Sequence, residues 1–389
     1  MTVFNGYRRS DGRVGIRNHV LILPASICAS DLAEMIARQI TGAVSFHNQV
    51  GCSQVPSDMQ YAMDMMAGLA ANPNVYGTIV VAAGCETCQC DMVMEAIRAR
   101  TNKPLHGFII QEEGGTIRLM EKAVRMAREM AATAAQLQKE PFPISELILA
   151  TECGGSDPTS GIAANPVIGC LSDRVVEKGG TVILSETTEF IGAERILAER
   201  AKDEEVRARI LDIVARYEHH FIQNGENVRL GNPTPGNKAG GLTTLEEKSL
   251  GCIHKGGESV INAVYDYGKQ IPSDMRGLVI MDTPGNDASS IAGMLAGGAQ
   301  ICVFSSGRGT PLGSPIAPVI KITGNDHTFQ VMEDNIDFNA APVITEGKSP
   351  LELSEDLYQM LVEFCCGRLT KAEALGFTET AVMRACNYV

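Results

Sequence analysis

The 389-residue chain contains no tryptophan, and only 5% of its residues are aromatic. Stacking platforms for single-stranded nucleic acid need aromatic side chains, so this composition argues against such a role. The sequence also contains no run of 18 or more apolar residues, which excludes a membrane-spanning helix of the usual length. The opening segment MTVFNGYRRSDGR contains no apolar stretch of the kind found in secretion signals, so we do not expect export.

Positive charge is scarce as well. The 33 Lys and Arg residues face 46 Asp and Glu residues, which gives a net charge of -13 and argues against general nucleic-acid binding. Any anionic substrate must therefore be held by cations that the fold gathers locally. Twelve cysteines in a chain without an export signal indicate a reducing compartment, where disulfides are rare, and we predict a cytoplasmic protein.

Two common nucleotide-binding motifs are missing. No G-x(4)-G-K-[ST] segment occurs, which argues against a nucleotide triphosphatase. No G-x-G-x-x-G follows the first predicted strand, which argues against a nicotinamide cofactor. The chemistry must be sought in other loops.

Short apolar runs alternate with helical patterns along the whole chain, which predicts an α/β fold of two Rossmann-like domains with mostly parallel sheets. The proline-rich stretch 140–143 interrupts a helical pattern, so we predict one domain over 1–140 and a second over 141–389. Segment 224–255 is rich in Gly, Pro, Asn and Thr and is predicted to be a long functional loop. The predicted strands are 20–23, 43–46, 77–83, 107–110, 147–150, 181–184, 278–281, 301–304 and 319–322. The predicted helices are 30–39, 58–70, 91–100, 116–139, 161–178, 193–221 and one that begins at 351.

Ligands of parallel α/β sheets bind beyond the carboxyl ends of the strands, so the residues that follow each strand are candidates for a site. His47, Cys52, Cys85 and Cys153 follow three different strands and offer nitrogen and sulfur donors that we predict to converge on one divalent metal ion. Cys85-x-x-Cys88 alone is a weak signal, because a structural zinc site needs a second pair of ligands and a thioredoxin motif fits poorly. A lone histidine such as His47 is often a structural residue, and the sequence leaves both readings open.

Glycine-rich loops with polar and cationic side chains suit the binding of anions. Within 305–310 we expect Ser306 and Thr310 to bind substrate and Arg308 to take part in catalysis. Within 234–241 we expect Asn237 to bind substrate and Lys238 to be catalytic.

Three further candidates lie elsewhere in the chain. Glu186 follows the predicted strand 181–184 and is a third candidate catalytic residue. Arg13 and Arg17 lie in a tight, glycine-punctuated segment near the N-terminus, where they are either solvated or part of the substrate site.

Four segments carry a resemblance to a known family: GYRRSDGRVGIRN at 6–18, HNQVGC at 47–52, ATECGGS at 150–156 and NPTPGN at 232–237. Together they resemble the altronate/galactarate dehydratases, a family of acid-sugar hydro-lyases, and the resemblance extends over essentially the whole chain. It implies a metal-dependent lyase, usually with Fe2+ and otherwise with another divalent metal. Such an enzyme eliminates a β-substituent from a small anionic 2-hydroxy acid.

The resemblance also implies a partner. Single-chain members of the family begin with a small β-rich SAF domain, whereas this sequence starts at the catalytic core. It therefore looks like the large subunit of a hetero-oligomer whose small subunit is a SAF-domain protein. That layout favours loss of sulfite from (2R)-3-sulfolactate to give pyruvate over loss of water from a sugar acid to give a 2-keto-3-deoxy acid. A non-enzymatic protein whose cysteine loops sense a metal or an acid is the alternative class.

Overall fold

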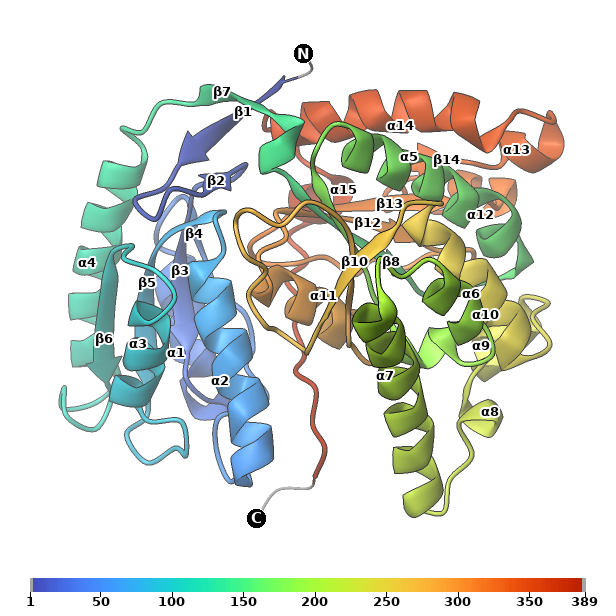
Figure 1. Ribbon diagram of the computed structural model, residues 1–389. Coiled ribbons are helices and arrows are strands. Elements are labelled where there is room, and N and C mark those ends of the chain that lie inside the picture. The colour runs from blue at the N-terminus through green and yellow to red at the C-terminus, as the bar shows by residue number, and fades with distance from the viewer. Residues whose placement is uncertain (1–2, 387–389) are drawn as a thin grey trace.

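A computed structural model describes residues 3–386 of the chain and contains two parallel sheets (Figure 1). The first sheet has the order β4-β3-β5-β6, with β3 at His19–Pro24, β4 at Ala43–Val44, β5 at Val75–Ala82 and β6 at Leu105–Ile109. Helices α1 (Ile27–Ala37) and α4 (Thr116–Ala134) pack on one face, and α2 (Pro56–Ala71) and α3 (Cys90–Arg98) pack on the other. This is the doubly covered sheet that the alternation of apolar runs predicts.

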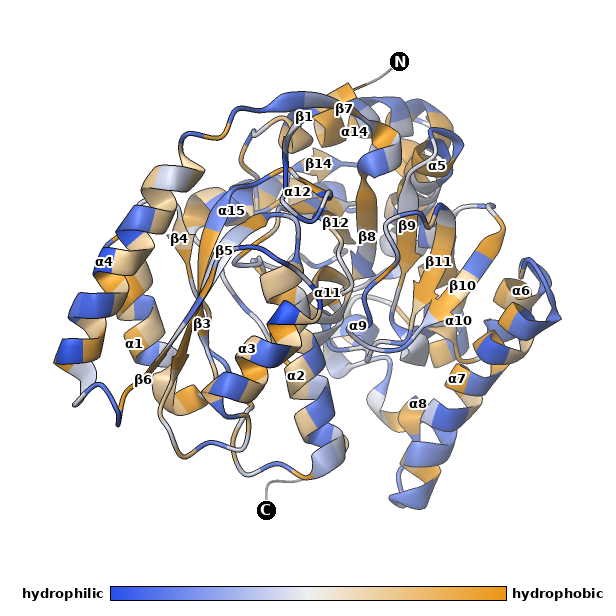
Figure 2. Ribbon diagram, turned by 60° about the vertical axis from the view of Figure 1, so that its left-hand side comes forward, coloured by the Kyte–Doolittle hydropathy of each residue, from blue (hydrophilic) through white to orange (hydrophobic). Residues whose placement is uncertain are grey.

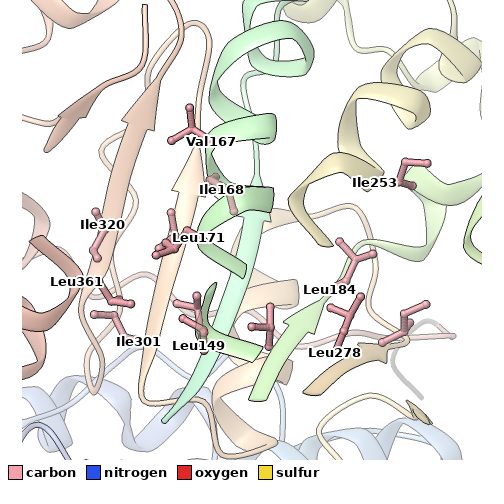
Figure 3. Packing of buried hydrophobic residues seen from close by; sticks show 14 of the residues in the cluster. Leu149, Val167, Ile168, Leu171, Leu184, Ile253, Leu278, Ile301, Ile320 and Leu361 are labelled. Carbon is pink, nitrogen blue, oxygen red and sulfur yellow. The ribbon is translucent and has the colours of Figure 1, made fainter. Parts of the chain in front are cut away.

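The second sheet is larger and also fully parallel, with the order β10-β11-β9-β8-β12-β13-β14. Its strands are β8 (Ile148–Cys153), β9 (Thr181–Leu184), β10 (Ile261–Tyr265), β11 (Gly277–Met281), β12 (Ile301–Ser305), β13 (Val319–Thr323) and β14 (Phe338–Asn339). Helices α5 (Asn165–Glu177) and α14 (Pro350–Cys365) cover one face, and α11 (Asp287–Ala296) covers the other. Figure 3 shows Leu149 and Ile301 of the sheet gathered with Leu171 of α5 and Leu361 of α14 in this core.

The two sheets share one hydrophobic cluster, in which α2 packs against α11. A Cβ atom at Gly68 of α2 would come within 2.5 Å of Ala296, so only glycine permits this close approach. Buried asparagines join the same boundary: Asn72 Nδ2 donates to the carbonyl oxygens of Leu295 and Ala299, each at 2.8 Å. These contacts join the two sheets near the amino ends of β5 and β12.

The prediction of an α/β fold with parallel sheets is confirmed, and each predicted strand is present. The sequence patterns did not predict a third, antiparallel sheet in which β1 (Val3–Arg8) pairs with β2 (Val14–Gly15) and β7 (Glu140–Pro143). The short edge strands β10 and β14 were not predicted either. Figure 2 shows hydrophilic residues along the outer faces of α4 and α7 (Glu204–Gln223), while the strands are mostly apolar.

The prediction of a long loop at 224–255 is wrong. This segment contains the helices α8 (Val228–Gly231), α9 (Pro235–Ala239) and α10 (Leu245–Ile253), followed by the 3-10 turn η4 (His254–Gly256). The Asn and Thr residues that suggested a loop are helix N-caps: the side chains of Asn227, Thr234 and Thr244 each accept a backbone hydrogen bond at the start of a helix. The predicted helix 193–221 is two helices, α6 (Glu194–Glu199) and α7, because Asp203 caps a new start.

The remaining short elements complete the chain. They are η1 (Ile144–Glu146), the π-helix η2 (Ser160–Ala164), η3 (Thr187–Phe190), α12 (Asp326–Val331), α13 (Pro342–Thr345) and α15 (Lys371–Leu375). Among the described residues, no helix is both long and apolar enough to cross a bilayer.

Candidate functional site

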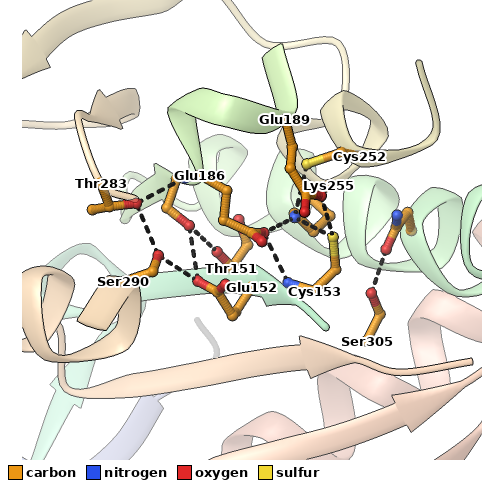
Figure 4. A network of polar contacts seen from close by, with 12 residues as sticks. Thr151, Glu152, Cys153, Glu186, Glu189, Cys252, Lys255, Thr283, Ser290 and Ser305 are labelled. Carbon is orange, nitrogen blue, oxygen red and sulfur yellow. Dashed lines mark hydrogen bonds and ion pairs between the residues drawn. The ribbon is translucent and has the colours of Figure 1, made fainter. Parts of the chain in front are cut away.

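Buried polar side chains gather at the carboxyl ends of the central strands β8, β9 and β11 (Figure 4). Cys153 is the last residue of β8, and Glu186 and Glu189 follow β9. Cys252 arrives on α10. The donor atoms of these four side chains lie within 4.8 Å of one another, and all four residues are buried. We call this set the Cys/Glu cluster, and its sulfur and oxygen atoms can hold a metal ion.

Hydrogen bonds fix the members of the Cys/Glu cluster to one another. The backbone amide of Cys153 donates to Glu186 Oε2 at 2.9 Å, and Cys153 Sγ donates to Glu189 Oε2 at 3.4 Å. Glu186 has a left-handed backbone with φ of 73°. Residues other than glycine are strained in the left-handed backbone conformation, and such strained residues are concentrated at functional sites.

Two lysines accompany the cluster. Lys255, fully buried in η4, donates to Cys153 Sγ at 2.9 Å and to Cys252 Sγ at 3.1 Å, and it forms an ion pair with Glu186. Lys248 of α10 lies 2.5 Å from Glu189 Oε1. Figure 4 shows the Lys255 side chain pointing in among Glu186, Cys153 and Cys252.

A second carboxylate group adjoins the first. Glu152, Glu186 and Asp287 also bring oxygen atoms within 4.8 Å of one another. Glu152 Oε2 accepts hydrogen bonds from Ser290 at 2.6 Å and from Ser185 at 3.1 Å. In the described part of the chain, the other oxygens Glu152 Oε1 and Glu186 Oε1 are buried without a hydrogen-bond partner. Such orphaned acceptors indicate that a cation, a proton or a ligand belongs beside them.

The electrostatics of the site follow from burial and crowding. Burial and the neighbouring Glu186 raise the pKa of Glu152 well above its ordinary value, and burial also raises the pKa of Glu186. Burial, with Glu186 and Glu189 nearby, raises the pKa of Asp287 to about 7. Burial alone would lower the pKa of Lys255, but Cys153, Cys252 and the carboxylates raise it well above normal. Four carboxyl groups thus share two ammonium groups, and an added positive charge would favour the ionised forms of the carboxyl groups whose pKa is raised.

A pocket of about 200 Å3 opens beside the cluster. Cys153 and Lys248 lie in its wall together with Ser156, Asp157 and Asn165, near the start of α5. Its size suits a small molecule of a few carbon atoms, and its wall offers hydroxyl, amide and ammonium groups. The buried Ser156 hydroxyl has no hydrogen-bond partner among the described residues, so a ligand oxygen can bind there.

Several predicted site residues lie at or next to this pocket. Cys153 and Glu186 belong to the Cys/Glu cluster. Asn237 Nδ2 donates to the Ser156 carbonyl at 2.9 Å, and the Arg308 amide donates to the Gly155 carbonyl at 2.9 Å. Arg308 Nη1 also donates to the Gly236 carbonyl at 3.3 Å. The loops that follow β8 and β12 therefore meet α9, as anion-binding loops around one pocket would.

Three more predicted residues belong to the same loops. The hydroxyl of Ser306 is buried without a partner among the described residues. Thr310 is half-buried, and its hydroxyl accepts a hydrogen bond from the Leu312 amide at 3.4 Å. Lys238 is exposed on α9. The structure places Lys238 one residue from Asn237 but records no contact between its ammonium and the cluster.

The predicted metal set needs correction. His47 lies with Asp31 and Glu34 on an exposed surface, where its Nε2 is 3.0 Å from Glu34 Oε2. Cys52 and Cys85 are not members of the Cys/Glu cluster either. Their loops adjoin each other, since the Cys88 amide donates to the Gly51 carbonyl at 2.8 Å. These loops follow strands of the first sheet and Cys153 follows a strand of the second, so the four side chains do not share one sheet edge.

Neither N-terminal arginine lines the pocket beside the Cys/Glu cluster. Arg17 is buried, pairs with Glu373 at 2.7 Å and donates to the carbonyl oxygens of Phe364 and Arg368. Arg13 lines a small cavity with Ile148 and Thr181, the first residues of β8 and β9. It therefore lies at the amino edge of the sheet, opposite the site. The position of segment 6–18 relative to the site could not be predicted from the sequence, because its pattern does not show that β1 belongs to a separate sheet.

Sequence patterns missed Cys252, Lys255, Lys248 and Glu189. The signal was nevertheless present, because Lys248, Cys252 and Lys255 recur at helical spacing within 248–255. Glu186 and Glu189 are also three residues apart. The assignment of 224–255 to a loop concealed this periodicity.

A doubly wound α/β protein with a buried thiol and carboxylate cluster beside a small polar pocket has the architecture of an enzyme that acts on a small, charged substrate. The family profile "D-galactarate/Altronate dehydratase, C-terminal" matches residues 144–387. The profile "D-galactarate dehydratase/Altronate hydrolase, second domain" matches residues 6–135. The chain belongs to the D-galactarate/altronate dehydratase family.

Named relatives support this assignment. The chain is 34% identical to the altronate dehydratase of Bacillus subtilis (strain 168), over 98% of this chain and 78% of the relative. It is 37% identical to the (2R)-sulfolactate sulfo-lyase subunit beta of Chromohalobacter salexigens, over 98% of this chain and 97% of the relative. It is 31% identical to the galactarate dehydratase (L-threo-forming) of Escherichia coli (strain K12), over 94% of this chain and 73% of the relative. Dehydratases and sulfo-lyases are lyases, and the chain is an enzyme of this class.

Proposed function

We propose that the chain is the large subunit of a metal-dependent lyase that catalyses β-elimination from a small 2-hydroxy acid. The observation that carries the proposal is the buried Cys/Glu cluster beside a pocket of about 200 Å3. A pocket of this size suits a substrate of a few carbon atoms. Deprotonation next to a carboxylate builds up negative charge, and a site that concentrates cations can stabilise it.

The residues of the cluster fit a divalent metal, and we propose Fe2+. Two thiols and two carboxyl groups within 4.8 Å of one another match the spacing that metal bonds of ~2.0–2.3 Å require. Mixed sulfur and oxygen donors suit iron or zinc better than magnesium or calcium. When bound, the metal would act as a Lewis acid on the substrate carboxylate and 2-hydroxyl.

The protein's own groups supply proton transfer. Asp287, whose pKa burial and its acidic neighbours raise to about 7, can both accept and donate a proton near neutral pH. Glu186 has a free, buried Oε1 and remains the candidate catalytic carboxylate that the sequence predicted. We assign proton abstraction and protonation of the leaving group to these acidic side chains.

Substrate binding is assigned to the surrounding loops. Arg308 offers a planar guanidinium that can hold a carboxylate or sulfonate with two hydrogen bonds. The free hydroxyl of Ser306, with Asn237 and Thr310 nearby, completes an anion-binding wall. Lys238, exposed on the adjacent helix α9, adds a positive charge to this part of the surface.

The favoured substrate is (2R)-3-sulfolactate, which would give pyruvate and sulfite. The support is similarity: the chain is 37% identical to the sulfo-lyase beta subunit and 34% identical to the altronate dehydratase of Bacillus subtilis. The alternative is an altronate- or galactarate-type sugar acid, which would lose water to give a 2-keto-3-deoxy acid. The word "subunit" in the relative's name supports a hetero-oligomer, and we propose a small SAF-domain partner in a cytoplasmic complex.

The test is turnover by the purified chain under anaerobic conditions with Fe2+, with and without the proposed small SAF-domain partner. We expect sulfite and pyruvate from sulfolactate, and stimulation by the partner. Keto-acid formation from altronate or galactarate without sulfite release would establish the alternative. No turnover of any of these acids, with partner and metal present, would refute the lyase assignment.

A further inference from the structure

The Lys255 ammonium occupies the position that a metal ion in the Cys/Glu cluster would need. Its three N–H groups are directed to Cys153 Sγ, Cys252 Sγ and Glu186 Oε2, which belong to three of the four residues of the cluster. An ammonium has three donors and no more, so this arrangement satisfies Lys255 completely. Such a coordination by thiols and a carboxylate resembles that of a small bound cation.

A metal ion and this ammonium cannot occupy the cluster together. Metal bonds to sulfur and oxygen are ~2.0–2.3 Å long, so an ion would lie between the same atoms that Lys255 contacts at 2.9 and 3.1 Å. Two positive charges at that separation in a buried site repel strongly. Metal binding therefore requires the Lys255 side chain to leave.

Without a metal, the cluster needs a cation from the protein. Lys255 and Glu186 are both fully buried, and a buried carboxylate without a partner is strongly destabilising. Lys248 cannot replace Lys255, because it is held by Glu189 at 2.5 Å and by Asn232 Oδ1 at 3.1 Å. The metal-free fold depends on Lys255 for charge balance.

The structure also offers the ammonium a second position. Glu186 Oε1 and Glu152 Oε1 are buried acceptors without a hydrogen-bond partner in the described residues. The Glu152 and Glu186 carboxylates lie within 4.8 Å of each other. A lysine side chain has four flexible carbons, and these two oxygens are the acceptors beside the cluster with which a displaced ammonium would pair.

We propose that Lys255 is an exchangeable counter-ion of the Cys/Glu cluster, which fills the cation position in the metal-free protein and moves to the free oxygens of Glu152 and Glu186 when a metal binds. The inference rests on the proposed metal-binding function. It adds that Lys255 competes with the metal ion for the cation position of the cluster. Because the metal must displace an occupant, the apparent metal affinity is lower than that of an open site with the same ligands. The occupant in turn keeps the ligands assembled before the metal arrives.

The test uses Co2+ as the probe, added to the metal-stripped full chain and followed by the absorption of thiolate-to-cobalt charge transfer. Lys255→Met removes the occupant, and we expect Co2+ to bind at least roughly tenfold more tightly than to the wild type. Lys248→Met is the matched control, because it removes one positive charge from the same cluster without vacating the cation position. A smaller gain is expected for that control.

Thermal unfolding supplies a second readout. Metal-free Lys255→Met is expected to melt at a lower temperature than the metal-free wild type, and saturating Co2+ is expected to remove the difference. If this variant does not fold without metal, it is purified in the presence of Co2+. Lys255→Arg then provides a second variant, for which the expected change in Co2+ affinity has the opposite sign. The longer, permanently charged guanidinium should stay in the cluster and weaken Co2+ binding.

The outcomes separate the two proposals. Absence of the thiolate band in the wild type and in every variant would overturn the metal site and the exchange with it. A band in the wild type, with Lys255→Met no tighter than Lys248→Met, would overturn the exchange and leave the metal site standing. A band that appears only in Lys255→Met would support the exchange in its strongest form.

Discussion

The Ser290 hydroxyl, on the first turn of α11, donates a 2.6 Å hydrogen bond to Glu152 Oε2 at the end of β8. Both residues are fully buried, and the same hydroxyl also contacts Thr283 at 2.8 Å. This bond links the helix on one face of the sheet to the carboxylate that adjoins the Cys/Glu cluster. It therefore couples the stability of the core to the geometry of the site.

Removing this bond should destabilise the protein. Ser290→Ala leaves a buried carboxyl group with the Ser185 hydroxyl as its remaining partner, and we expect a loss of about 1–3 kcal/mol in the free energy of unfolding. Urea denaturation measures the change. Ser273→Ala, on an exposed turn, should shift stability by no more than about 0.5 kcal/mol. Equal effects of the two substitutions would show that the bond contributes nothing.

Metal removal should abolish activity. Chelation of the active complex should eliminate turnover, and Fe2+ should restore it, because the Cys/Glu cluster holds the proposed ion. Cys252→Ser replaces a soft sulfur donor with a hard oxygen and should weaken metal binding at least roughly tenfold, measured by metal titration. Cys28→Ser, which alters an exposed thiol, serves as the control. Undiminished turnover after complete removal of metal would refute the proposal.

The guanidinium of Arg308 should matter for its shape as well as its charge. Arg308→Lys keeps the charge but loses the planar pair of donors, and we expect kcat/KM to fall by roughly tenfold or more. Arg195→Lys, at an exposed position of α6, is the control for a general effect of the exchange. Wild-type kinetics in Arg308→Lys would identify Arg308 as a solvated loop residue.

Arg17 should affect folding and not substrate binding. Arg17→Met leaves Glu373 without its buried partner and frees two carbonyl groups, so we expect a loss of about 3–5 kcal/mol of stability. Arg368→Met, which breaks the exposed pair with Glu363, should cost at most about 1 kcal/mol. At a temperature where the variant stays folded, KM should be unchanged. A raised KM with full stability would restore the substrate-binding role that the sequence suggested.

Lys321 gives stability a pH dependence that is independent of the metal. Its side chain is fully buried, and burial lowers its pKa from 10.5 to about 8. The charged form is disfavoured in the folded state, so the penalty is complete below about pH 8 and disappears as the pH rises through 10.5. Lys321→Met should therefore stabilise the protein at about pH 7, by about 1–4 kcal/mol.

The gain from Lys321→Met should shrink as the pH rises from about 8 toward 10.5, because the folded-state lysine is then neutral and the penalty for burying its charge is lost. Thermal unfolding at several pH values measures this trend. A gain of the same size at every pH would mean that packing, and not charge, explains it.

The strand pattern was readable because parallel strands are buried on both faces and appear as continuous apolar runs. The runs at 181–184 and 301–304 lie in strands β9 and β12. Edge strands such as β14, at Phe338–Asn339, are too short to leave such a signal. Segment 224–255 was misread because Thr and Asn suit both turns and helix N-caps, and only the hydrogen bonds of Thr234 and Thr244 distinguish the two.

Local sequence thus determined the α/β class, most strands and the candidacy of Cys153, Glu186 and Arg308, because these depend on periodicity and on position after a strand. Tertiary structure alone decided which loops meet. Two separate sheets divide the predicted ligands, so His47 stays with Asp31 and Glu34 while Cys153 joins Cys252, 99 residues further along the chain. The physical reason is that a side chain's partners across a sheet edge are set by strand order, and strand order is a property of the packed core, which no local pattern encodes.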